Sequence, residues 1–200
     1  VANDINRIRD GQMQYTGMLN EDGTFFEDIT VWRKNSDEWY AFPVARDKVV
    51  QRFQMYSELV DDAHVVDLTS AFGGPLALQG PRTKDALQKI ADIDLSTLKR
   101  FYGTECNLAS CPTVIDRAGY TGENGFELFP RSEDTGTVWK AVVEAGKEFG
   151  VIPMGGAALG SLRLEKGLVG SREFTGANPF ELGLGRFVRL NKTAFIGQEA

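Results

Sequence analysis

Residues 116–130, DRAGYTGENGFELFP, decide how the chain folds. The glycines and asparagine at the centre of this stretch predict a tight turn, and the apolar residues on either side predict the two strands of a hairpin. Glu127 lies between apolar neighbours, so period-two alternation points its side chain to the face opposite Phe126 and Leu128. If that face lines a cavity, Glu127 is a buried acceptor for a ligand with paired N–H donors. Alternation alone favours a solvated carboxylate on an exposed face.

The composition is that of a soluble globular protein. A chain of 200 residues, 42% hydrophobic and 25% charged, is long enough for one medium domain or two small intertwined ones with a sizeable core. A net charge of −6 without a basic tract argues against nucleic acid as a partner, although a local basic pocket can hold an anionic small molecule. We find no apolar run of membrane-spanning length and no secretory signal pattern, so we expect a cytoplasmic protein without a membrane partner. Because the sequence starts without Met, we also expect a fragment of a larger protein.

Cysteine and histidine content exclude several kinds of site. Cys106 and Cys111 are expected to be reduced thiols, with a disulfide as the alternative. With His64 as the single histidine and no paired Cys-x-x-Cys motifs, no metal site is predicted. The absence of a Gly-x-Ser-x-Gly elbow argues against triad hydrolysis. The glycine-rich stretches 73–81 and 154–160 match neither a P-loop nor a dinucleotide fingerprint.

The first part of the chain predicts three antiparallel strands followed by a helix. Asp22-Gly23 between apolar runs favours a hairpin, because glycine accepts a positive φ. Helical spacing of Val49, Phe53 and Tyr56 predicts the helix. The expected elements are strands 13–19, 25–32 and 38–44 and a helix over 46–59 that Asp47 caps.

A similar order of elements then begins again. Pro81 suits the first turn of a helix, and Ser132 offers an N-cap to an amphipathic one. The recurrence predicts an α+β fold with two related halves. The expected elements are strands 65–70 and 75–78, a helix over 82–91, strands near residues 101, 108, 114 and 126, and helices over 135–149 and 157–166.

Six segments form a recognisable combination of motifs: QMQYTGMLNEDGTFFEDITV (12–31), PLALQGP (75–81), DRAGYTGENGFEL (116–128), LGSLRLEKG (159–167), NPFELGLGRFVRL (178–190) and FIGQEA (195–200). Taken together, and in this order, they resemble the folate-binding core of the glycine-cleavage aminomethyltransferase (T-protein) family. The resemblance implies an α+β fold of two β-α-β-type halves, with antiparallel or mixed sheets, around a central folate pocket. It also implies a first half over 1–62, a second half over 63–175 and a return segment over 176–200 that leads toward the family's C-terminal barrel, which is missing here.

The resemblance also implies roles for four residues. Asp28 matches the family carboxylate that faces the reactive edge of folate, where an anion can orient the accepting nitrogen and stabilise cationic character on the transferred carbon. Glu127 matches the glutamate that accepts adjacent N–H donors from the 2-amino-4-oxo edge of the pterin. Tyr15 and Tyr120 match tyrosines that line the pocket. Without the motif, each would be an ordinary strand or core residue.

The sequence departs from the family pattern in two places, at Leu159 and Gly160 and at Pro43. Leu159 stands where the family has an arginine that meets the glutamate tail of folate, and Gly160 replaces the acidic residue after it. Arg163 matches a different family arginine. Pro43 replaces an asparagine at the end of the third strand. Recognition of the pterin end is therefore expected to be retained, while recognition of the tail is altered.

The function implied is tetrahydrofolate-dependent one-carbon transfer from an aminomethyl or N-methyl amine donor. The donor would be an aminomethyl-lipoyl carrier protein or a small amine. The segments LRLEKG and LGLGRFV look closer to the folate domains of dimethylglycine and sarcosine dehydrogenases, which implies a fused or associated flavin dehydrogenase. The alternatives are a non-catalytic folate-binding or regulatory module, or a folate-free structural domain of a larger oxidoreductase.

Overall fold

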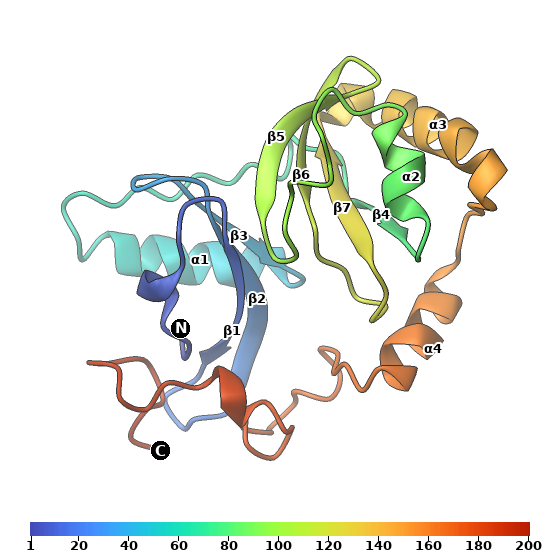
Figure 1. The fold of residues 1–200 in the computed structure, drawn as a ribbon. Coiled ribbons are helices and arrows are strands. Elements are labelled where there is room, and N and C mark those ends of the chain that lie inside the picture. The colour runs from blue at the N-terminus through green and yellow to red at the C-terminus, as the bar shows by residue number, and fades with distance from the viewer. The chain divides into compact units, whose positions relative to one another are not determined.

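The computed structural model describes residues 1–200, which form two compact units. Unit 1 comprises residues 1–67 and 169–200, and unit 2 comprises residues 68–168. Each unit has its own antiparallel sheet, which confirms the α+β class (Figure 1). None of the helices is both long enough and apolar enough to cross a bilayer.

Unit 1 is built on a three-stranded sheet in the order β1-β2-β3. The turn after β1 contains Gly23 at φ +78°, a conformation that glycine adopts without a steric penalty. Ile29 and Val31 pack against Val49 of the helix, which explains why the helical spacing predicted that element. The elements of unit 1 are η1 Ile5–Arg7, β1 Met13–Leu19, β2 Phe25–Arg33, β3 Trp39–Pro43, α1 Arg46–Ser57 and η4 Gly185–Phe187.

Residues 169–200 complete unit 1 by packing against its first strands. Phe174 stacks on Phe25 with ring centroids 4.6 Å apart, and both side chains are buried. Ala2 donates its amide to the Gly17 carbonyl and accepts from the Arg189 amide, both at 2.9 Å. The sheet of unit 1 is therefore covered by segments from both ends of the sequence.

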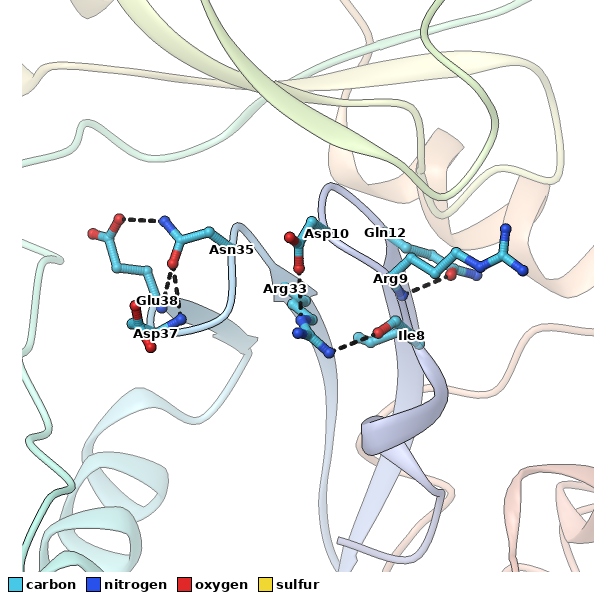
Figure 2. A network of polar contacts seen from close by, with 8 residues as sticks. All are labelled: Ile8, Arg9, Asp10, Gln12, Arg33, Asn35, Asp37 and Glu38. Atoms are coloured by element: carbon cyan, nitrogen blue, oxygen red, sulfur yellow. Dashed lines mark hydrogen bonds and ion pairs between the residues drawn. The ribbon is translucent and has the colours of Figure 1, made fainter.

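A polar network fixes the ends of β1 and β2 (Figure 2). The guanidinium of Arg33 lies 2.8 Å from an Asp10 carboxylate oxygen and donates to the Ile8 carbonyl at 3.2 Å. In the following turn, the Asn35 side chain accepts from the amides of Asp37 and Glu38, each at 2.9 Å. These contacts hold the β2–β3 connection, and they explain the turn predicted there.

Unit 2 is built on a four-stranded antiparallel sheet in the order β4-β7-β6-β5. The helices α2 and α3 cover one of its faces, which carries the core (Figure 1). Ile115, Phe126 and Leu128 are at most 1% exposed on that face. The elements of unit 2 are β4 Leu76–Gln79, α2 Thr83–Gln88, β5 Gly103–Leu108, β6 Cys111–Asp116, β7 Gly125–Pro130, η2 Ser132–Asp134, α3 Thr135–Gly146, η3 Lys147–Phe149 and α4 Gly156–Glu165.

Five local predictions are wrong. The strands expected near residues 101 and 108 are a single strand, β5, and Phe101 lies in the turn before it. The strand expected over 65–70 is irregular, because its apolar residues find no partner strand, and Val66 is 71% exposed. The connection between β6 and β7 spans residues 117–124 and is longer than a tight turn. Asp47 does not cap α1 but pairs with Arg46, and the N-cap of α3 is Asp134, because Ser132 begins a preceding 3-10 turn.

Candidate functional site

Glu127 lies in the middle of β7, on the face of the sheet opposite the core, as alternation predicts. Its cross-strand partner on β6 is Asp116, so the two carboxyl groups point to the same face. Ala77 of β4 pairs with Glu127 on its other side, and Gly103 of β5 pairs with Asp116. The sheet thus presents two neighbouring carboxyl groups flanked by two very small residues.

This face of the sheet is not the solvated surface that alternation alone favours. Glu127 is partly buried, and Asp116 is only 2% exposed. Burial and then the Glu127 charge raise the pKa of Asp116 to about 8, while the backbone amides of Ala118 and Glu127 act in the opposite direction. Burial also raises the pKa of Glu127. Two adjacent buried carboxyl groups favour a state in which they share one proton.

The side chain of Gln79 supports the loop that leads to Glu127. Its amide nitrogen donates to the Ala118 carbonyl at 3.1 Å, and its carbonyl oxygen accepts from the Thr121 hydroxyl at 2.9 Å. A Cβ on Gly119 or Gly125 would lie within 2.4 Å of the Gln79 side chain, so both positions require glycine. Sequence reasoning missed this role, although the segments PLALQGP and DRAGYTGENGFEL, quoted above as motifs, contain all of these residues.

Tyr120 lies in the same loop, between β6 and β7, and is 36% exposed. It therefore belongs to the same unit as Glu127, and its ring is accessible to a ligand. The two predicted ligand-binding residues of unit 2 therefore lie on β7 and on the loop that leads into it.

Tyr15 and Asp28 come together in unit 1. They lie on the neighbouring strands β1 and β2, where Gly17 is the cross-strand partner of Asp28 and adds no side chain beside it. The Tyr15 side chain is hydrogen-bonded to the Asp28 carboxyl group. Burial raises the pKa of Asp28 to about 6; the Tyr15 hydrogen bond opposes this shift, and neighbouring Glu27 adds to it. Asp28 is thus a partly buried acid that titrates near neutral pH, as acid–base groups of active sites do.

Glu27 is a second buried acid of unit 1, to which the sequence analysis assigned no role. Its side chain is 2% exposed and lies 3.3 Å from the Lys48 ammonium group of α1. The same carboxylate accepts from the backbone amide of Asp28 at 3.2 Å. A signal was present in the sequence, because Glu27 falls on the same alternating face as Phe25 and Ile29.

The two positions that depart from the family pattern are placed as follows. Pro43 is the last residue of β3 and pairs with Ile29, and Leu159 is a partly buried residue of α4. The cysteines are both free, as expected. Burial raises the pKa of Cys106 to about 12, so this thiol is not a nucleophile at neutral pH.

The chain thus has an α+β fold with acids of raised pKa on both of its antiparallel sheets, and such shifts are common at functional sites. Comparison with known proteins defines the family. The chain belongs to the GCVT N-terminal domain family, whose model matches residues 1–192. The resemblance to the aminomethyltransferase family is therefore confirmed.

Several curated relatives are similar to the chain over its full length. An aminomethyltransferase of Anoxybacillus flavithermus is 40% identical over 204 residues, which cover 100% of this chain and 56% of the relative. A second aminomethyltransferase, from a Geobacillus species, is 36% identical with the same coverage. The chain thus spans about half the length of the curated relatives it matches.

Two solved structures share the fold. The glycine cleavage system aminomethyltransferase T of Bartonella henselae matches with a TM-score of 0.78 at 23% identity, over 96% of this chain and 52% of that one. The heterotetrameric sarcosine oxidase of Corynebacterium sp. U-96 matches with a TM-score of 0.52 at 20% identity, over 70% of this chain and 69% of that one. At these identities the likeness concerns the fold alone.

Proposed function

We propose that this chain is the folate-binding part of an aminomethyltransferase that moves a one-carbon unit from an aminomethyl or N-methyl amine donor to tetrahydrofolate. The environment of Asp28 is the observation that carries the proposal. This residue has a partly buried carboxyl group, held by Tyr15, with its pKa raised to about 6. Membership of the GCVT family and relatives named aminomethyltransferase support this assignment.

Asp28 has the properties that one-carbon transfer requires of an acidic group. Tetrahydrofolate, when bound, supplies the nitrogen nucleophile that accepts the carbon. At neutral pH most of the Asp28 population is ionised, since its pKa is about 6, so the carboxylate can stabilise positive charge on the carbon in transit. The raised pKa also suits Asp28 for taking up the proton that the attacking nitrogen loses.

Glu127 is proposed to bind the pterin end of folate. An ionised carboxylate accepts two adjacent N–H donors in a two-point pairing, which fixes the orientation of the ring as well as its position. Tyr120, in the loop before β7, is proposed to line the same site. The Gln79 side chain stabilises this loop through its bonds to Ala118 and Thr121.

The proposed donor is an aminomethyl-lipoyl carrier protein, from which ammonia would be released. A second candidate is a folate domain that receives an imine from a fused or associated flavin dehydrogenase. The fold likeness to the sarcosine oxidase favours this candidate, and the higher TM-score of the aminomethyltransferase structure favours the first. A cytoplasmic location is part of the proposal.

The test is calorimetric titration of the chain with tetrahydrofolate under anaerobic conditions, with Glu127→Gln and Asp28→Asn as isosteric variants. We expect Glu127→Gln to weaken binding by about 10- to 100-fold, because an N–H group would then face an N–H donor of the ligand. Asp28→Asn is expected to bind folate within a few-fold of wild type. It should lose transfer of an isotope-labelled carbon from the donor by about 100-fold or more.

The outcomes separate the candidate functions. Absence of binding by wild type at high micromolar tetrahydrofolate would refute every folate-dependent function. Binding without transfer from an aminomethyl-lipoyl or N-methyl amine donor would identify a folate-binding module instead of an enzyme. Transfer that survives in Asp28→Asn would remove Asp28 from the reaction.

A further inference from the structure

Asp116 has no part in the function proposed so far, yet it is the most deeply buried charged residue beside Glu127. The two residues are directly opposite on antiparallel strands, where Cβ atoms lie about 4.5–5.5 Å apart. Asp116 is 2% exposed. Two ionised carboxylates at that separation repel each other, so the pair retains one proton near neutral pH.

The two oxygens of Asp116 differ in their surroundings. Oδ1 accepts from the Ala118 backbone amide at 2.9 Å, which fixes the orientation of the carboxyl group at the end of β6. Oδ2 is buried and has no hydrogen-bond partner. A buried polar atom without a partner is rare in native structures and is more often found in groups that have a functional role.

Few other charged groups act on this pair. Burial and then the Glu127 charge raise the pKa of Asp116 to about 8, so Asp116 holds the shared proton below that pH. Arg117, next in sequence, donates its guanidinium to the Leu98 carbonyl at 2.9 Å. The cross-strand partners of Glu127 and Asp116 on the outer strands are the uncharged residues Ala77 of β4 and Gly103 of β5. Two residues further along the same face, β4 has the neutral Gln79 and β5 has Glu105, whose side chain is exposed.

We propose that Asp116 is a second ligand-contacting residue of the Glu127 site, and that as a neutral acid it donates a hydrogen bond from Oδ2 to a ring oxygen. The site then presents two acceptors from Glu127 and one donor from Asp116. This array fits a heterocycle edge with two N–H donors followed by a carbonyl oxygen. The 2-amino-4-oxo-pyrimidine edge has that order, so this inference rests on the proposed function and deepens it.

The structure indicates which variants test this role. In Asp116→Asn, the side-chain oxygen can keep the bond from the Ala118 amide, which places the NH₂ group where Oδ2 lies. Asparagine therefore preserves the donor but does not titrate. Asp116→Val introduces a β-branched residue, which suits a strand, and removes both donor and acceptor.

The experiment is calorimetric titration of the 200-residue chain with tetrahydrofolate and with 6-methyltetrahydropterin, which has the same ring edge and no glutamate tail. At pH 7 we expect Asp116→Asn to bind the pterin within about threefold of wild type and Asp116→Val to bind it about tenfold more weakly. Between pH 7 and 9.5, wild type should lose affinity progressively, whereas Asp116→Asn should not. Unfolding midpoints verify that each variant is folded.

Two results would overturn the inference. One is unchanged affinity of a folded Asp116→Val. The other is an equal loss of affinity at high pH in wild type and in Asp116→Asn, because that loss would then come from titration of the ligand. This second comparison remains decisive even if Asp116→Val does not fold. If Glu127→Gln weakens binding while the Asp116 variants behave as wild type, this inference fails and the proposed function stands. If wild type binds neither probe, both fail.

Discussion

The ion pair between buried Glu27 and half-exposed Lys48 in unit 1 gives a prediction whose size follows from the structure. The two charged atoms are 3.3 Å apart, and the side chains are 2% exposed for Glu27 and 45% exposed for Lys48. Coulomb's law gives about 5 kcal/mol at an effective dielectric constant of 20 and about 1 kcal/mol in water. Because Lys48 is half exposed and Glu27 loses its hydration on burial, we expect a net coupling of about 1–2 kcal/mol.

The perturbation is Lys48→Met, which keeps the length of the side chain and removes its charge. Lys48 also donates to the Phe26 carbonyl and lies near the Phe26 ring, so the single variant loses more than the ion pair. A double-mutant cycle with Glu27→Gln isolates the coupling. The assay is urea unfolding of the wild type, both single variants and the double variant at pH 7.

We expect Lys48→Met alone to lower the free energy of unfolding by about 2–3 kcal/mol, because it leaves an unpaired buried carboxylate. In the background of Glu27→Gln the same substitution should cost about 1–2 kcal/mol less, since no charge is then left unpaired. A coupling below about 0.3 kcal/mol, which is within the usual additivity of independent sites, would refute the ion pair as a stabilising contact.

Three further predictions concern acids and glycines. Asp116 has a folded-state pKa of about 8, above its unfolded value of about 3.9. Between these two pKa values the folded state binds more protons than the unfolded state, so stability falls as the pH rises through that range. Asp116→Asn removes this titration and should flatten the pH dependence of the urea unfolding midpoint, measured at pH 5, 7 and 9. Gly125→Ala places a Cβ 2.4 Å from Gln79 and should destabilise the chain by about 1–3 kcal/mol in thermal unfolding. The control is Gly136→Ala in α3, whose Cβ meets nothing within 4 Å; it should leave stability unchanged or raise it by up to about 1 kcal/mol. Glu27→Gln removes a negative neighbour of Asp28 and should lower the pKa of Asp28 below about 6. Nuclear magnetic resonance titration would detect this as a carboxyl titration midpoint at lower pH, and an unchanged midpoint would contradict the prediction.

Most of the secondary structure could be predicted because local chemistry specifies it. The Asp22-Gly23 turn and the alternation after it are sufficient to define β1 and β2. The strand expected over 65–70 shows where such reasoning ends. An apolar, β-branched run forms a strand only when a partner strand is available, and partners are determined by the whole fold.

The candidate site shows the same limit. Alternation determined which face Glu127 occupies, but it could not show that this face is buried or that Asp116 is its partner. Both facts depend on the register between β6 and β7. The loop that connects these two strands is longer than expected, so the sequence did not define that register. Gln79 was missed for a similar reason, since its contact with Ala118 joins positions 39 residues apart.

The closure of unit 1 by both ends of the sequence has a consequence for the order of folding during synthesis. Unit 2 is a continuous segment over residues 68–168, whereas unit 1 needs residues 169–200 as well as 1–67. A ribosome therefore delivers all of unit 2 before the segment that carries Phe174 and Arg189 has emerged. Until then the buried partners of that segment, Phe25 and Ala2, remain uncovered in the nascent chain. Unit 2 can thus complete its folding first, whereas β1 and β2 are synthesised before unit 2 but are fully packed only after it.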